Sequence, residues 1–433
     1  MIRTFHLFTL LFFIGTGISA QELLPLEEAV NLGLAQNLGI EVARVEQQST
    51  EMQVYRSNAG FGPVLDLNAN AGATVNRVQQ NYLDGRVVDR FGRSLAPNVS
   101  LGLDWTVYDG GRMQATFDRL KELSNASSIE TQIAIQDLVS QIIQSYYDVM
   151  RLKARVNFLN TVIKYYEDRL NITEERWNVG KGSKIDFLQS KTDLNAQLSE
   201  RAIANNDFKN AKIRLNGLLN RELDIDFDVE EEVVFNADYS LPELMQTVDE
   251  KNQDVILLRK FHDISLISER EIEATRKPQV GFSSTLGFFY TNTNANFILS
   301  NQNASLNVGF NARWNILDGK HRHNQLAIAR VNTHGLEKQE EDLLVRLHSQ
   351  LTEAYNQYLS DKELLDFEEQ NKELAEENLA ISLEKFRLGD STILELNEAQ
   401  RSYDTALNRL VNAQHNIRIS ELRLLEISGQ LVR

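Results

Sequence analysis

The sequence predicts a mainly α-helical protein with four β-strands, in which one structural unit occurs twice along the chain. Three observations lead to this prediction. Similar residues recur at a fixed offset, four segments alternate apolar and polar residues, and two long stretches without proline carry helical patterns. The chain has 433 residues, of which 42% are hydrophobic, so it can bury a sizeable core.

The repeat rests on residues of the same type that recur in both halves. Pro63 and Pro278 lie 215 residues apart, whereas Trp105 and Trp314 lie 209 residues apart. Further pairs at these two offsets are Leu26/Leu241, Asn37/Asn252, Asp109/Asp318, Gly110/Gly319, Tyr146/Tyr355 and Gly180/Gly389. The change of offset falls between Pro63 and Trp105, and a loop tolerates such a change best. We therefore expect a first repeat over residues 21–237 and a second over 238–433.

Each half contains two segments with the alternation of a β-strand that has one apolar and one wet face. In the first half these are Val64–Gly72 and Val99–Val107, and in the second half they cover 280–290 and 306–316. We expect a short helix before each strand pair. Polar loops are expected within the pairs, at Asn76–Asn98 and Thr291–Asn303.

The remainder of each half reads as helix. Proline occurs only at positions 25, 63, 97, 242 and 278, so neither long stretch after the strands contains a helix breaker. An apolar stripe with steps of three and four residues runs from Ile129 to Tyr166. A helix from about Met113 to Val179 would be about 100 Å long at 1.5 Å per residue. Two such helices per half predict long antiparallel, coiled-coil-like hairpins.

A glycine turn marks the tip of each expected hairpin. Gly180 is followed by Ser183, and Gly389 is followed by Thr392. Glycine ends a helix in the left-handed conformation at little cost, and Ser or Thr caps the next helix. Glu395 stands three residues after Thr392, which predicts a capping box, and Asp186 stands in the same place after Ser183 as a shortened version.

Composition and motifs exclude several classes of function. The formal net charge of −16 argues against a nucleic-acid partner, because no basic surface is available to displace counterions from phosphates. The chain has no cysteine, and His321 and His323 lack the further ligands that a metal site needs. The sequence contains no Gly-rich phosphate-binding loop and no Ser/His/Asp order with a supporting motif. We expect neither a cofactor nor an enzymatic activity.

The first twenty residues have the pattern of a secretory signal peptide. Arg3 precedes an apolar run over Leu7–Ile14, and small residues lead to Ala20. Cleavage before Gln21 would export the chain. Later segments never reach 18 uninterrupted apolar residues, so we expect no transmembrane helix after export.

Four strands with a lipid-suited face cannot close a barrel alone. An unpaired backbone group in hydrocarbon costs several kcal/mol, so other copies must complete the sheet. A dimer would give eight strands, whose interior is about filled by side chains, whereas a trimer gives twelve and leaves a lumen. The Asn, Gly and Thr residues of the wet faces suit a water-filled interior. This favours the trimer.

At this point the chain resembles the TolC-like outer-membrane efflux proteins. The resemblance covers Gln21–Leu431 and rests on a signal peptide, a strand pair ending in Trp-x-x-x-Asp-Gly, a hairpin with a Gly-x-x-Ser/Thr tip, and the repetition of this order. It implies a homotrimer with a twelve-stranded transmembrane β-barrel in the outer membrane and an α-helical barrel in the periplasm. It also implies a passive exit duct of an efflux or secretion system, coupled to an inner-membrane transporter through a periplasmic adaptor.

The resemblance assigns roles to a few residues. The adaptor-contacting tips correspond to Val179, Gly180, Ser183, Leu388, Gly389 and Thr392. Glu395 and Glu398 match paired carboxylates at the family's pore constriction, and Asp186 is assigned to the same constriction. The capping role and the pore role of Glu395 remain open alternatives. Phe386 and Ser391 replace a tyrosine and an arginine that lock the closed tip in some members.

A reading from another class remains. The same helices could form a secreted periplasmic structural coiled-coil protein without a pore, in which the strands make a soluble cap. Fractionation separates the two readings, because a channel is recovered with the outer membrane and a structural protein with the soluble periplasm.

Overall fold

The computed structural model describes residues 22–230, 238–294 and 298–431. The expected signal peptide, 1–20, lies outside the described residues, and so does the end of the first expected repeat at residue 237. The described chain forms two compact units. Unit 1 comprises the described parts of Met1–Glu41, Ile135–Val248 and Ser349–Arg433, and unit 2 comprises Val42–Ala134 and Asp249–His348. Each unit therefore takes segments from both repeats.

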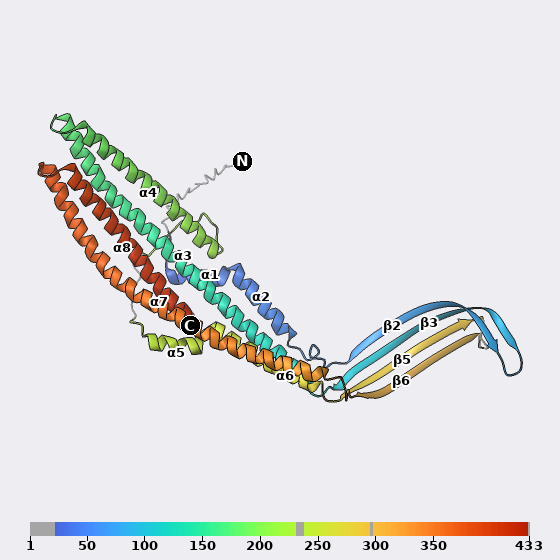
Figure 1. Ribbon diagram of the computed structural model, residues 1–433. Helices are drawn as coiled ribbons and strands as arrows, with labels where there is room; N and C mark the ends of the chain where they lie inside the picture. The colour runs from blue at the N-terminus through green and yellow to red at the C-terminus, as the bar shows by residue number, and fades with distance from the viewer. Residues whose placement is uncertain (1–21, 231–237, 295–297, 432–433) are drawn as a thin grey trace, which may run out of the picture. The chain divides into compact units, whose positions relative to one another are not determined.

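The fold is mainly helical, as the sequence predicts (Figure 1). Its helices are α1 (Leu26–Gln36), α2 (Leu38–Gln53), α3 (Arg112–Asn178), α4 (Lys184–Leu218), α5 (Leu241–Lys251), α6 (Gln253–Ala274), α7 (His321–Leu388) and α8 (Ile393–Ile427). Its strands are β1 (Glu22–Leu24), β2 (Val64–Asn81), β3 (Val87–Tyr108), β4 (Phe227–Val229), β5 (Gln279–Thr293) and β6 (Ser300–Arg313). None of the helices in the described residues is both long and apolar enough to cross a membrane.

Unit 2 contains the four expected strands in one antiparallel sheet of order β2-β3-β5-β6 (Figure 1). The two hairpins of this sheet have the same register. Leu67 pairs with Leu101, and the residues at the repeat offsets, Phe282 and Phe310, pair with each other. The sequence repeat thus corresponds to a repeat in strand pairing.

The strands are longer than the alternation predicted, and the expected polar loops are wrong in extent. β2 continues to Asn81 and β3 starts at Val87, so most of Asn76–Asn98 is paired strand. Polar side chains stabilise this part across the strands, since Arg77 donates to both carboxylate oxygens of Asp89 at 2.8 and 2.9 Å. The expected loop Thr291–Asn303 is likewise shortened from both ends by β5 and β6.

Matching contacts connect the end of each strand pair to the segment that leads into it from the preceding helix. Trp105 donates its indole N–H to the carbonyl of Phe61, and Trp314 donates to the carbonyl of Arg276, both at 3.1 Å. Asp109 follows β3 and accepts from the backbone N–H of Met113 at 2.8 Å, next to Gly110 at φ +80°. Asp109 and Gly110 therefore form the turn between β3 and α3.

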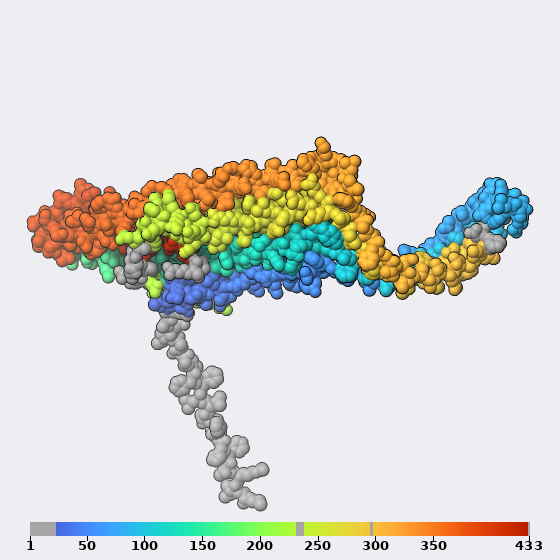
Figure 2. All heavy atoms as spheres, turned by 90° about the horizontal axis from the view of Figure 1, so that it is seen from below, coloured from blue at the N-terminus to red at the C-terminus, as the bar shows by residue number. Residues whose placement is uncertain are grey.

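The helices of unit 2 follow the same lateral order as the strands. Thr131 of α3 donates to the carbonyl of Ala43 in α2, Lys260 of α6 pairs with Glu122 of α3, and Arg259 of α6 pairs with Glu340 of α7. Figure 2 shows this order on one face, where the orange of α7, the yellow of α6, the teal of α3 and the blue of α2 follow one another. Helices α2 and α7 thus form the two edges.

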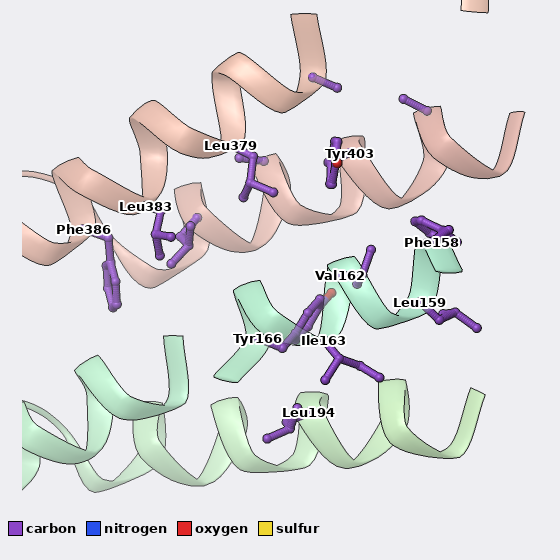
Figure 3. Close-up of a cluster of buried hydrophobic side chains, with 14 of the residues drawn as sticks. Phe158, Leu159, Val162, Ile163, Tyr166, Leu194, Leu379, Leu383, Phe386 and Tyr403 are labelled. Atoms are coloured by element: carbon purple, nitrogen blue, oxygen red, sulfur yellow. The ribbon is translucent and has the colours of Figure 1, made fainter. Parts of the chain in front are cut away.

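Unit 1 contains helices α4 and α8 together with the parts of α3 and α7 that pair with them to form the two helical hairpins, whereas the first parts of α3 and α7 belong to unit 2. Their shared core is a cluster of buried side chains from all four helices, including Phe158 and Ile163 of α3, Leu194 of α4, Leu379 of α7 and Leu396 of α8. Figure 3 shows side chains of α3 directed at those of α7 and α8, with Leu194 directed at α3 from the other side. Burial of this apolar surface joins the hairpins to each other.

Two local features of unit 1 were not predicted. The expected first helix is two helices, because the side-chain oxygen of Asn37 accepts from the backbone N–H groups of Gly39 and Ile40 and restarts the chain as α2. Strands β1 and β4 form a small parallel pair. Here Tyr146 donates to the carbonyl of Leu24 at 2.8 Å, and its repeat mate Tyr355 donates to that of Tyr239 at 3.1 Å.

Candidate functional site at the hairpin tips

Both tips have the turn geometry that the glycines predict. Gly180 and Gly389 lie at φ +72° and +92°, where an L side chain is strained. The backbone N–H of Lys181 donates to the carbonyl of Arg176 at 2.8 Å, and Asp390 donates to Lys385 at 3.0 Å. These bonds satisfy the last carbonyls of α3 and α7 in the same way.

The two caps differ in detail. Thr392 accepts from the backbone N–H of Glu395, whose carboxylate accepts in return from the backbone N–H of Thr392, both at 3.3 Å. The predicted capping box is therefore present at α8. Ser183 accepts from the backbone N–H of Ile185 at 3.1 Å, which makes it the N-cap of α4.

The three carboxylates predicted from the sequence lie near the start of the second helix of their hairpin, one in α4 and two in α8. Asp186 is half-buried in the first turn of α4. Glu395 and Glu398 are exposed near the start of α8, and their spacing of three residues places them on one side of that helix. Glu395 combines an exposed carboxylate with its capping contact.

Apolar side chains surround each tip turn in equivalent positions. Val179 and Ile185 are exposed on the first hairpin, and Leu388 and Leu394 are exposed at the same places on the second. Four exposed apolar side chains at two adjacent turns form a candidate contact surface for another protein.

A contact between the hairpins lies just inside the tips. The guanidinium carbon of Arg176 in α3 lies 4.6 Å from the ring centroid of Phe386 in α7, and Arg176 also donates to the carbonyl of Phe386. Phe386 is buried. A cation over an aromatic face is attracted to the ring, so this pair ties the end of α3 to the end of α7.

A larger polar network lies about two helical turns further in. The side chain of Arg169 is almost fully buried and donates to the side chains of Asp193 in α4 and of Asn397 and Gln400 in α8. Its guanidinium carbon also lies 4.9 Å from the ring centroid of Tyr166. Arg169 therefore links both hairpins through charge-assisted hydrogen bonds.

The same network contains a titratable carboxylate. Asp404 of α8 accepts a hydrogen bond of 3.1 Å from the hydroxyl of Tyr166. Burial raises the pKa of Asp404 to about 6, because desolvation outweighs the opposing effects of the Tyr166 hydrogen bond and the Arg169 charge. Its protonation state therefore changes near neutral pH.

Sequence reasoning missed these network residues, although one signal was present. Tyr166 was assigned to the buried stripe of α3, and Arg169 and Thr173 continue that stripe at steps of three and four residues. A charged residue at a stripe position indicates a buried ion that needs partners. The partners lie in α4 and α8, and helical periodicity alone does not identify them.

Within the described residues no group of three or more possible ligands could hold a metal ion. The site offers turns, apolar side chains and exposed carboxylates. The apolar side chains can contact another protein, and the carboxylates can attract cations.

The fold and the tips define a class of protein. It has a four-stranded antiparallel sheet joined through Asp-Gly turns to two long helical hairpins, with every part present twice. A family model described as outer membrane efflux protein matches residues 29–221 and 270–430. The chain belongs to the outer membrane efflux protein family. This is a family of channels, which agrees with the expectation of a non-enzymatic protein.

Individual proteins are similar over most of the chain. Outer membrane protein TolC of Vibrio cholerae serotype O1 is 20% identical over 381 residues, which cover 84% of this chain and 82% of that protein. The structure of the outer membrane protein VceC from Vibrio cholerae matches with a TM-score of 0.73 at 17% identity, over 93% of this chain and 96% of VceC. The CmeC outer membrane channel of Campylobacter jejuni matches with a TM-score of 0.75 at 15% identity, over 94% and 85% of the two chains.

Proposed function

We propose that this protein is a homotrimeric outer-membrane channel, the passive exit duct of a tripartite efflux or secretion system. Each copy contributes four strands to a twelve-stranded β-barrel and two hairpins to an α-barrel in the periplasm. The observation that carries the proposal is the sheet of unit 2, in which β2 and β6 each pair on one side only within the described residues.

The faces of this sheet match a barrel wall. Leu101 pairs with Leu286 and Val99 pairs with Phe288, so the apolar positions of neighbouring strands share one face. The other face carries polar and small residues, such as Asn68 opposite Ser100. An apolar face suits lipid, and a polar face suits a water-filled lumen. Edges in lipid must be paired, so other copies complete the wall.

The repeat predicts the register of the strand pair that would form between two copies in the proposed barrel. The contact between β3 and β5 joins the last strand of the first repeat to the first strand of the second. The equivalent contact between copies joins β6 to β2 of the next copy. Applying the repeat offsets to the pair Val99 and Phe288 places Val308 opposite Ala73 of that copy.

The tips support coupling to a periplasmic adaptor. The exposed residues Val179, Ile185, Leu388 and Leu394 occupy equivalent places on the two hairpins, so one adaptor surface can contact either tip. In this proposal the adaptor buries these side chains and recruits an inner-membrane transporter, which supplies the energy for export.

The exposed carboxylates support a role at the pore constriction. Three copies would place six carboxylates from Glu395 and Glu398 around the bore, with Asp186 of the neighbouring hairpin close to the same end. Such a ring of negative charge attracts cations to the bore.

The protomer count tests the proposal. The mass of the purified protein in detergent, with the detergent contribution subtracted, should equal three chains. A monomer would contradict the proposal, because four strands cannot enclose a lumen. Recovery in the soluble periplasm instead of the outer membrane would support the alternative coiled-coil protein.

A further inference from the structure

The seam between α3 and α6 inside the chain is held by ion pairs. Lys260 of α6 lies 3.1 Å from Glu122 of α3. Two further pairs join the same helices, Arg119 with Glu271 at 2.9 Å and Arg270 with Asp118 at 4.0 Å. All of these residues belong to unit 2.

The repeat assigns an equivalent position to each partner. In lateral order, α3 and α6 are the inner helices, whereas α7 and α2 form the two edges (Figure 2). Helix α7 is the repeat mate of α3, and α2 is the repeat mate of α6. The offsets convert Glu122 into Val331 and Lys260 into Val45. They are the offsets that relate the registers of the two β-hairpins.

The positions equivalent to the other two ion pairs also lack a pair of opposite charges. Arg119 and Glu271 become Ile328 and Arg56, and Asp118 and Arg270 become Ala327 and Tyr55. Val45, Val331, Ile328 and Tyr55 are all exposed in the single chain, at 58%, 70%, 61% and 67%. Both edge helices, α2 and α7, thus expose apolar side chains at equivalent positions, and such exposed apolar surface is typical of a contact with another protein.

We propose that α7 packs against α2 of a second copy through an apolar seam centred on Val331 and Val45, in contrast to the ionic seam inside each chain. This inference rests on the proposed oligomer and adds its contact residues and their chemistry. Salt screens exposed ion pairs, whereas apolar contacts do not weaken with salt in this way. The seam between copies therefore resists salt, and the ionic seam within each copy is the sensitive one.

Cysteine pairs test the seam without background, because the chain contains no cysteine. The V45C/V331C double variant of the full-length protein is oxidised mildly in detergent and separated under denaturing, non-reducing conditions. Covalent dimers and trimers should exceed those of either single variant by at least about tenfold, since a disulfide forms only where the Cα atoms lie within about 7 Å. The matched control V99C/F288C, whose two positions pair directly in the sheet, crosslinks within one chain and stays at monomer mass.

A charge transplant tests the chemistry of the seam. V331E buries an unpaired charge between copies and should lower the trimer fraction about tenfold in a mildly dissociating detergent. V331E/V45K copies the internal ion pair and should restore trimers at low salt but lose them at high salt. An unchanged trimer fraction in V331E overturns the proposed seam.

The outcomes separate this inference from the proposed function. A trimeric mass with no V45C/V331C crosslink overturns the seam and leaves the channel standing. A monomeric mass overturns the channel itself.

Discussion

Arg169 of the first hairpin donates a hydrogen bond of 2.7 Å to the side-chain oxygen of Gln400 of the second, and both side chains are 1% exposed. A buried charge is stable only when it is paired and hydrogen-bonded. The two terminal nitrogens of Arg169 meet this condition with partners from α4 and α8, whereas its Nε has no hydrogen-bond partner among the described residues. The network thus joins the two hairpins through Arg169.

Arg169→Met should destabilise the protein strongly. The change leaves the amide of Gln400 without its charged partner and leaves Asp193 without its cation. Removing one partner of a buried pair costs about 3–5 kcal/mol, and the partial exposure of Asp193 reduces this to about 2–3 kcal/mol. The midpoint of thermal unfolding in detergent measures the effect.

Arg155→Met is the matched control. Arg155 pairs with Glu200 at 3.5 Å, and both side chains are more than 40% exposed. An exposed ion pair contributes about 0–1 kcal/mol, so the midpoint should hardly move. Equal effects of the two variants would show that the buried network has no special role.

The sequence predicted the elements that depend on local pattern. The expected helix from about Met113 to Val179 is α3, Arg112–Asn178, because a single apolar stripe and the absence of proline specify it. The tip turns were predicted from Gly180 and Gly389, because glycine ends a helix in the left-handed conformation at little cost. Local chemistry determines a cap or a turn, and the structure confirms both.

Features that depend on distant partners were not predictable in this way. The β2–β3 hairpin extends through a polar stretch, and its cross-strand ion pair of Arg77 and Asp89 carries no periodic signal. Likewise, the stripe identifies Arg169 as buried but does not identify Asp193, Asn397 or Gln400 as its partners. A pattern in one helix contains no information on which helix will face it.

Acidification should stabilise the hairpin core through Asp404. Its pKa is about 6 in the folded protein and about 4 in an unfolded chain, so the charged form is disfavoured by folding. This penalty is present above pH 6 and disappears as the pH falls from about 6 to 4. The gain from Asp404 is about 2–3 kcal/mol, measurable as a rise of the unfolding midpoint over this range.

Asp404→Asn isolates this effect. Asparagine keeps an acceptor for the Tyr166 hydroxyl and carries no charge, so the variant should be more stable than the native chain at pH 7 and equal to it near pH 4. Asp148 has the opposite sign, because His415, whose Nε2 lies 3.4 Å from its carboxylate, and Arg151 lower its pKa to about 2, and it titrates below this window. A native profile that is flat between pH 4 and 6 would refute the assignment.

The two roles of Glu395 can be separated by glutamine. Glu395→Gln removes the charge but keeps an acceptor for the backbone N–H of Thr392, whereas Glu395→Ala removes both. The alanine variant should lose about 1 kcal/mol of stability relative to the glutamine variant. Thermal unfolding of the two proteins measures this difference, and identical midpoints would exclude a capping contribution.

Cation preference tests the proposed constriction. Glu395→Gln with Glu398→Gln removes the charge of both exposed carboxylates while the cap of α8 is kept. In planar bilayers this double variant should show weaker cation selectivity and weaker block by divalent cations, because the negative ring loses its charge. Glu384→Gln is a control, since Glu384 is exposed and lies in α7 before the tip. Unchanged selectivity in the double variant would assign both residues a purely structural role.

Closure of the barrel predicts one strand pair between copies. Val308 should lie opposite Ala73 of the next copy, because these positions correspond by the repeat offsets to the pair Val99 and Phe288 inside the chain. Directly opposed residues in an antiparallel pair have Cα atoms about 4.5–5.5 Å apart, which suits a disulfide. A73C/V308C should therefore give covalent trimers on oxidation, whereas V99C/F288C should crosslink within a chain and remain at monomer mass.

A shift of one residue in either strand would place the two side chains on opposite faces, so A73C with N307C should not crosslink. Efficient crosslinking of that shifted pair in place of A73C/V308C would contradict the register, and with it the equivalence between the seam inside the chain and the seam between copies.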